Sequence, residues 1–188
     1  MDVTVREKNI EEIEDRLLSM DTPLNKITYL ESVLKEAGFN FEVKRFLWGR
    51  LSDLYCERKM FEKAARAMSN KAALEIMSKD RIESFITAAE LYSKIGKVED
   101  ADVMFARASR DSDVNSIVRV KLARKNIYFG AARELEGKGK RGSAVKFYEK
   151  LMKMALEDVE RTMIKEKLIG SYKGLGMFRE ARLLEGVD

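Results

Sequence analysis

Apolar residues recur at steps of three and four along most of the chain, the spacing that places them on one face of an α-helix. Between Arg81 and Ala108, two such stripes flank the tripeptide Ile95-Gly96-Lys97. Glycine readily adopts the left-handed backbone conformation with which helices commonly end, so Gly96 predicts a tight turn. We therefore expect two antiparallel helices, joined as a hairpin, in this part of the chain.

The same arrangement recurs at three further places. Turns are expected at Arg58-Lys59-Met60, at 137–140 and at Gly174-Leu175-Gly176, each between two amphipathic stripes. Internal repetition on this scale is typical of proteins built from stacked helical hairpins. Because proline occurs only once, at Pro23, little in the sequence interrupts helix formation.

The N-terminal segment and the segment 109–118 depart from this regularity. Residues 5–44 predict a divergent hairpin, in which Asp21-Thr22-Pro23 starts the second helix and Gly38 ends it. Segment 109–118 is rich in serine, aspartate and asparagine, and it predicts the longest internal loop of the chain.

Large and small side chains follow one another in a fixed order within each hairpin. In the clearest copy this order is formed by Phe85, Ala88, Ala89, Tyr92, Gly96, Ala101, Phe105 and Ala108. Small residues on one helix admit the large side chains of its neighbour, so that the two helix axes approach to about 8–10 Å. This order resembles the tetratricopeptide repeat, a helix–turn–helix unit of 34 residues.

The hairpins also differ from that family. The units begin at 45, 82, 125 and 162, so their spacings of 37, 43 and 37 residues all exceed the family's. The proline with which the family ends its second helix is absent from every unit. Longer helices without this proline are also similar to those of the vesicle-fusion adaptors of the SNAP type.

The resemblance implies an all-α fold in a single domain. The expected architecture is a right-handed superhelical solenoid of about five antiparallel hairpins. Its units would be 5–44, 45–81, 82–124, 125–161 and 162–188.

In repeats of this kind, the first helix of each hairpin lines a concave surface that binds a protein or peptide segment. Carried over by position, the resemblance implies a partner-binding surface made of Phe46, Asp53, Glu83, Ile86, Glu90, Asn126, Phe129, Arg133 and Lys173. An exposed Phe129 beside Asn126 and Arg133 is the best anchor, because aromatic and arginine side chains dominate binding energies. We therefore expect a scaffold or adaptor.

The chain offers little to a catalytic mechanism. It contains no histidine, the commonest general base and transition-metal ligand, and its one cysteine, Cys56, therefore has no histidine to activate it. We expect no enzyme activity, no cofactor and no metal site. A single thiol without an apolar leader favours the cytoplasm. No apolar run approaches the ~20 residues that span a bilayer, so no membrane insertion is expected.

Charge is distributed unevenly along the chain. Residues 1–118 carry 19 Lys and Arg against 22 Asp and Glu, whereas residues 119–188 carry 17 against 10. A basic stripe in the second part would be formed by Lys121, Arg124, Lys125, Lys138, Lys140 and Arg141. The alternative function is therefore an RNA- or ribosome-associated protein that contacts phosphates through this stripe. Homo-oligomerisation through an end face is a further alternative.

Overall fold

The computed structural model describes residues 5–36 and 38–186, and this part of the chain is helical throughout, without a strand. Its ten helices are α1 Ile10–Leu18, α2 Pro23–Val33, α3 Phe41–Glu57, α4 Phe61–Ala73, α5 Ser78–Lys94, α6 Val98–Arg110, α7 Val114–Gly137, α8 Arg141–Met152, α9 Asp158–Gly174 and α10 Phe178–Glu185. The prediction of an all-α chain is confirmed.

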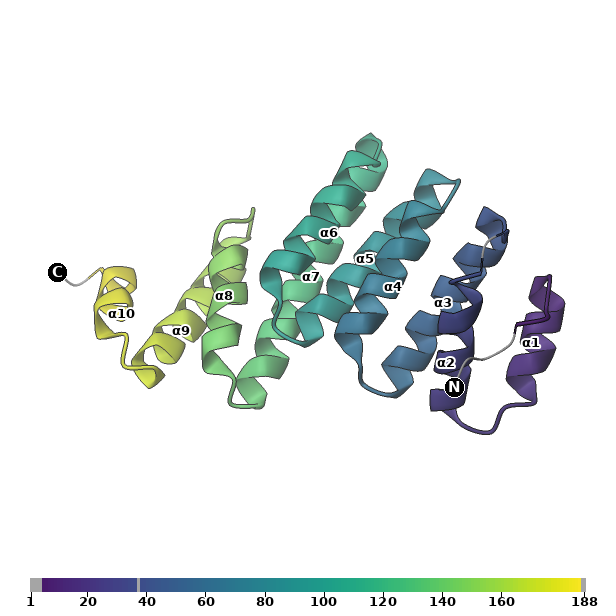
Figure 1. The fold of residues 1–188 in the computed structure, drawn as a ribbon. Helices are drawn as coiled ribbons and strands as arrows, with labels where there is room; N and C mark the ends of the chain where they lie inside the picture. The colour runs from purple at the N-terminus through teal and green to yellow at the C-terminus, as the bar shows by residue number, and fades with distance from the viewer. Residues whose placement is uncertain (1–4, 37, 187–188) are drawn as a thin grey trace.

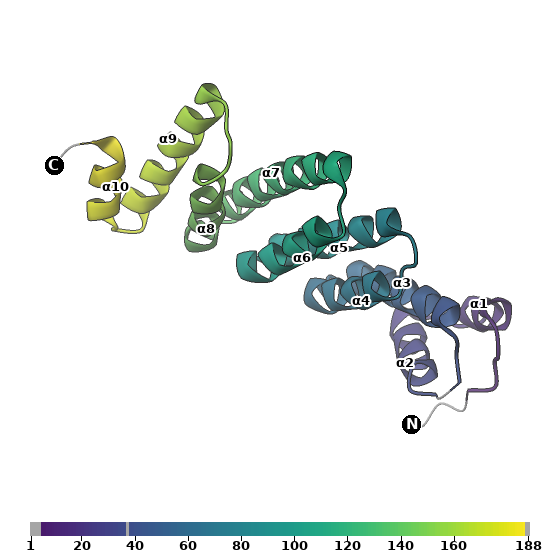
Figure 2. The ribbon, with the colours of Figure 1, turned by 90° about the horizontal axis from the view of Figure 1, so that it is seen from above.

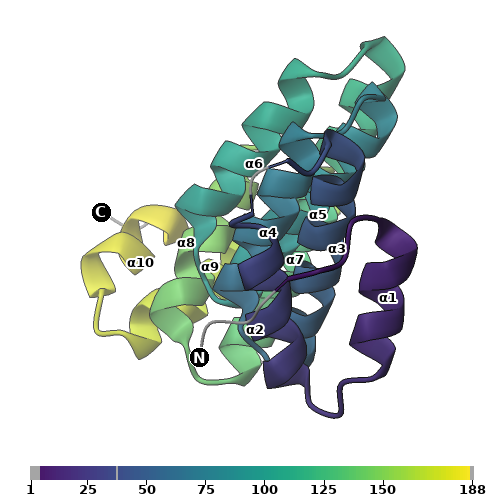
Figure 3. The ribbon, with the colours of Figure 1, turned by 45° about the vertical axis from the view of Figure 1, so that its right-hand side comes forward.

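The helices lie side by side in chain order, so that the molecule forms an elongated row with α1 and α10 at opposite ends (Figure 1). Seen from above, α3, α5, α7 and α9 occupy one side of the row, and α4, α6, α8 and α10 occupy the other (Figure 2). The oblique view in Figure 3 shows the same two sides. We call α3, α5, α7 and α9 the first helices, and the side they form the first-helix face.

Four turns join a first helix to the second helix that follows, and they share one geometry. In each, the last residue of the turn donates its backbone N–H to a carbonyl five residues earlier; the pairs are Met60 to Tyr55, Lys97 to Tyr92, Lys140 to Leu135 and Met177 to Tyr172. The preceding residue has a positive φ; these residues are Lys59, Gly96, Gly139 and Gly176. This left-handed ending satisfies the last carbonyls of the helix. The four turns lie where the sequence predicted them.

The start of α2 is as predicted, but its end is not. Pro23 is the first residue of the helix, and the backbone N–H of Asn25 donates to the Thr22 hydroxyl over 3.2 Å. However, α2 ends at Val33, and Gly38 lies in the connection to α3 with a φ of 115°. Gly38 therefore shapes this connection instead of ending the helix.

The prediction of a long loop at 109–118 is wrong. Helix α6 continues to Arg110, and α7 already begins at Val114. Asp113 caps α7, because its carboxylate accepts the backbone N–H of Ser116 over 2.7 Å. The polar residues of this segment thus form a helix start, and the 43-residue spacing arises from α7, which has 24 residues.

Ion pairs join α7 to its two first-helix neighbours at different heights. Near its start, Arg119 pairs with Glu83 of α5, and each is the sixth residue of its helix. Lys125, the twelfth residue of α7, pairs with Glu160, which is only the third residue of α9. Helix α9 therefore starts alongside the middle of α7, and the length of α7 accommodates this displacement.

Buried aromatic rings from α6, α7 and α8 pack against one another. The ring of Tyr128 meets Phe105 and Phe147 edge to face, with centroids 5.5 Å and 5.2 Å apart. All three side chains are almost fully buried. Such edge-to-face pairs stabilise a core by about 0.5–1.5 kcal/mol beyond the burial of their area. This contact fixes α7 and thereby the side chains it presents on the first-helix face.

Candidate partner-binding surface

A depression of about 400 Å³ lies between α5 and α7, and a second of about 290 Å³ lies between α7 and α9. The α7–α9 depression is lined by Lys125, Asn126, Phe129, Gly130, Arg133, Leu151, Leu156, Glu160, Met163 and Ile164. Three residues predicted as the anchor, Asn126, Phe129 and Arg133, thus share one depression with apolar side chains of α9. Sites that bind ligands commonly combine an apolar lining with a few polar groups.

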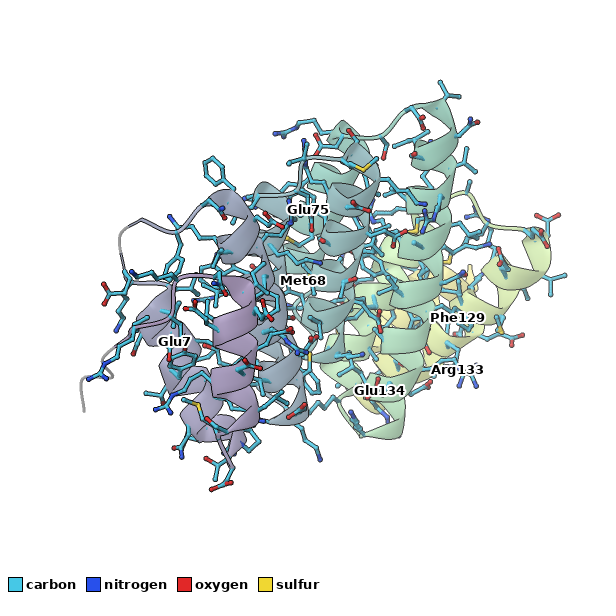
Figure 4. All side chains as sticks on the ribbon, turned by 90° about the vertical axis from the view of Figure 1, so that its right-hand side faces the viewer. Glu7, Met68, Glu75, Phe129, Arg133 and Glu134 are labelled. Carbon is cyan, nitrogen blue, oxygen red and sulfur yellow. The ribbon has the colours of Figure 1, made fainter. Side chains whose placement is uncertain are left out.

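Phe129 and Arg133 lie one helical turn apart and contact each other. The Arg133 guanidinium carbon is 5.9 Å from the centre of the Phe129 ring, within the range of a cation–π interaction. Figure 4, which looks along the row, shows the two side chains next to each other at one edge of the molecule. The expectation of an exposed Phe129 is wrong, because the ring is half-buried against the core.

The α5–α7 depression adjoins the α7–α9 depression. Asn126 and Gly130 line both, and Glu90, which was also predicted, lines the α5–α7 depression together with Ser93 and Lys94. A Cβ added to Gly130 would meet no atom within 4 Å, so packing does not require glycine there. Glycine inside a helix costs about 1 kcal/mol relative to alanine. The surface above Gly130 is therefore open to a partner.

A third depression, of about 480 Å³, lies between α1, α3 and α4. It is lined by Phe46 and Asp53, both predicted, and by Arg50, which the sequence analysis missed. The Arg50 guanidinium carbon is 5.7 Å from the centre of the Phe46 ring. Phe46 and Arg50 have the same i, i+4 spacing as Phe129 and Arg133, and this shared spacing is the sequence signal that would have identified Arg50.

The remaining predicted residues contact the protein itself. Ile86 is half-buried and packs against the core, and Glu83 is paired with Arg119 of α7. Lys173 in the last turn of α9 donates a hydrogen bond over 2.5 Å to the carboxylate of Glu185 in α10. Contacts within the protein thus engage Ile86, Glu83 and Lys173. Ion pairs likewise engage two residues that line the depressions, because Arg50 pairs with Glu14 and Glu90 with Lys94.

Half of the predicted basic stripe is already paired. Arg124 contacts Asp102, Lys125 contacts Glu160 over 2.7 Å, and Lys138 contacts Glu134 over 2.5 Å. Lys121, Lys140 and Arg141 are exposed and form no ion pair with any residue that the structure describes. Pairing weakens the attraction of this segment for phosphates.

Two ionisable groups near the depressions have shifted pKa values. Burial raises the pKa of the Cys56 thiol, against the opposing effect of Lys94, so the thiol is protonated at neutral pH and a weak nucleophile. The hydrogen bond from Lys125 lowers the pKa of Glu160, which therefore remains a carboxylate at the border of the α7–α9 depression. The surface thus offers charged and apolar contacts to a partner.

Comparison of the chain with models of known protein families and with curated proteins finds no match in either. Across residues 5–36 and 38–186, no three histidine, cysteine, aspartate or glutamate side chains are grouped as a metal site would need. Within the same residues, every helix is too short or too polar to cross a membrane.

Proposed function

We propose that this chain is a non-catalytic scaffold that binds a protein or peptide segment along its first-helix face. The observation that carries the proposal is the repeated pair of a phenylalanine and an arginine one turn apart. Phe46 with Arg50 and Phe129 with Arg133 each line a depression, on α3 and on α7. A few residues dominate the binding energy of known interfaces, and arginine and large aromatic side chains are enriched among them.

The architecture that we propose is a superhelical solenoid of repeats like the tetratricopeptide repeat. Four turns with the same hydrogen bonds support it, as does the burial of the small residues Ala88, Ala101 and Ala108 between large ones. Each hairpin of such a solenoid needs a neighbour to complete its core. The proposal places the protein in the cytoplasm, where its single thiol would stay reduced.

The test compares the wild-type chain with a variant that carries Phe129→Ala and Arg133→Ala. Both tagged proteins are used to capture partners from a native lysate, and the retained proteins are identified by mass spectrometry. We expect a discrete set of proteins that the wild-type chain retains and the variant loses, because hot-spot truncations each cost about 2 kcal/mol or more. An unchanged far-ultraviolet circular dichroism spectrum shows that the variant is folded.

A nuclease treatment separates this function from RNA binding. Retained proteins that survive the nuclease support the scaffold, whereas ribosomal or RNA-bound proteins that disappear would favour the alternative function. In that case, binding should also fall steeply with salt, because phosphate contacts release counterions. An identical set of partners for the wild type and the double variant would contradict the proposed surface.

A further inference from the structure

The first two and a half turns of α7 extend past the start of α9. Because Lys125 of α7 pairs with Glu160, the third residue of α9, the first residue of α9 lies level with residue 123, and residues 114–122 have no α9 residue beside them. We call residues 114–122 the α7 overhang. The displacement between α7 and α9 thus leaves uncovered a part of the helix surface that a neighbour covers further along.

The overhang carries an exposed apolar stripe. Val114, Val118 and Leu122 follow one another at intervals of four, which places them on one face of the helix. Their side chains are 82%, 64% and 53% exposed. Steps of three and then four residues from Leu122 lead to Lys125 and Phe129, which line the α7–α9 depression. The stripe therefore continues the face of α7 that borders the α7–α9 depression.

A depression of about 450 Å³ lies between this stripe and the connection 153–157 that joins α8 to α9. It is lined by Val118, Lys121, Leu122, Arg124, Lys125, Met154 and Ala155. Four of these residues are apolar and three are basic, and the lining contains no carboxylate. An occupant that complements it would bring apolar side chains together with negative charge.

The basic residues around this depression are not fully neutralised. Arg124 and Lys150 both contact the same carboxylate, Asp102, so two cations share one anion. The Nε of Arg124 is buried and has no hydrogen-bond partner in the described part of the chain. Lys121 is exposed and forms no ion pair there either. A carboxylate from a partner would reduce this excess of positive charge.

We propose that the α7 overhang binds an amphipathic helix of a partner protein. The apolar side chains of that helix would contact Val118 and Leu122, and its carboxylates would face Lys121 and Arg124. A helix fits because an amphipathic helix carries apolar side chains and carboxylates together, as the lining requires, and helices commonly bind in apolar grooves. This surface adjoins the α7–α9 depression through Lys125, which lines both, but Phe129 and Arg133 do not line it. The proposal therefore does not depend on the function proposed for the first-helix face.

Two other occupants agree less well with the surface. A second copy of the chain, in a symmetric dimer, would place Lys121 of each subunit near the same patch of the other, where like charges repel. A flat bilayer would not fill a depression that the helix and the 153–157 connection border on two sides. Both occupants are distinguishable by experiment.

The probe is a fluorescein-labelled synthetic peptide of about 14 residues, long enough to cover the overhang as a helix. Leucines recur at helical spacing, and glutamates occupy the other positions; a second peptide replaces every glutamate by lysine. Fluorescence anisotropy should show that the glutamate peptide binds the wild-type chain more tightly than the lysine peptide does. Leu122→Asp should weaken binding of the glutamate peptide by about tenfold or more.

Matched variants separate this site from the rest of the molecule. Leu24→Asp alters a leucine of almost equal exposure, 55%, on α2 and should leave the affinity unchanged. Phe129→Ala with Arg133→Ala should also leave it unchanged, because these side chains line the α7–α9 depression and not the depression beside the overhang. Lys121→Glu should weaken the glutamate peptide and strengthen the lysine peptide. Circular dichroism before each titration shows that the variant is folded.

The proposal is overturned if the two peptides bind alike, or if neither Leu122→Asp nor Lys121→Glu changes the affinity. Analytical ultracentrifugation of the wild type would overturn it in another way, if a dimer forms that Leu122→Asp dissociates. Cosedimentation with vesicles that contain phosphatidylserine, lost in Leu122→Asp, would identify a bilayer as the occupant and equally contradict the partner helix.

Discussion

At the scale of single residues, tyrosines on first helices hydrogen-bond to carboxylates on the helices that precede them. The pairs are Tyr55 with Glu31, Tyr128 with Asp102 and Tyr172 with Glu149. Burial raises the pKa of each tyrosine, and the adjacent carboxylate raises it further. The phenols therefore remain donors throughout the neutral range, and each joins two successive hairpins.

Asp102 is the centre of the largest of these contacts. Burial by itself raises the pKa of its carboxyl, but hydrogen bonds from Lys150 and Tyr128 and the charge of Arg124 outweigh this effect, so the pKa lies below its usual value. A pKa that is lower in the folded than in the unfolded chain stabilises the fold above about pH 4. This stabilisation is lost as the pH falls and Asp102 becomes protonated.

Asp102→Asn should therefore destabilise the protein in a pH-dependent manner. We expect a cost of about 2 kcal/mol in the free energy of unfolding at pH 7, since hydrogen bonds to a charged group are lost. The cost should shrink as the pH falls through the lowered pKa of Asp102 and the wild-type carboxyl itself becomes protonated. Urea denaturation of both proteins at several pH values measures this difference in the free energy of unfolding.

Asp53→Asn is the control for this prediction, because Asp53 is exposed and forms no ion pair with any described residue. It should change stability little at any pH. A cost of Asp102→Asn that is the same at pH 7 and at low pH would show that the contacts of Asp102 do not depend on its charge.

At the scale of helices and turns, the sequence predicts much, because the apolar spacing and the turn residues act locally. The turns after α3, α5, α7 and α9 lie where glycine or the tripeptide Arg58-Lys59-Met60 indicated them. The start of α7 was missed, since Asp113 and its polar neighbours are as typical of a helix cap as of a loop. A capping aspartate directly before an apolar stripe was the signal available.

The candidate site could be predicted only in part. Asn126, Phe129 and Arg133 lie on one helix at local spacing, and the structure brings them to one depression. The apolar residues opposite them, such as Met163 of α9 and Leu156 of the connection 153–157, depend on the height at which α9 lies beside α7. That height is set by contacts between distant segments, such as Lys125 with Glu160, which no local pattern indicates.

The turn between α5 and α6 also lies against the next hairpin, and this contact leads to a prediction about stability. Gly96 has a φ of 81°, and a Cβ added there would lie 3.2 Å from the Cβ of Ser143 in α8. Gly96→Ala should therefore lower the free energy of unfolding by more than the about 1–2 kcal/mol that a left-handed alanine costs by itself. Urea denaturation at neutral pH measures the loss.

Gly139→Ala provides the matched comparison. Gly139 occupies the same position in the turn after α7 and has a φ of 72°, but an added Cβ would meet no atom within 4 Å. This variant should show only the backbone cost. Equal losses for the two variants would mean that the turn after α5 does not press against α8.

At the scale of the whole molecule, the row displays the first helices on one side and the second helices on the other (Figure 2). The α5–α7 and α7–α9 depressions adjoin across Asn126 and Gly130, while the depression at Phe46 and Arg50 lies further towards α1. A partner segment that follows the row would contact several hairpins at once. Its affinity would then arise from many modest contacts around a few anchors.

Hydrogen exchange of the chain, with and without a captured partner, tests this account most directly. We expect partner binding to slow amide exchange in α5, α7 and α9, because a bound segment suppresses local opening of the helices it covers. Exchange in the second helices α4 and α6 should change little. Protection confined to α4, α6 and α8, or to the basic turn 138–140, would contradict the claim that the first-helix face binds the partner.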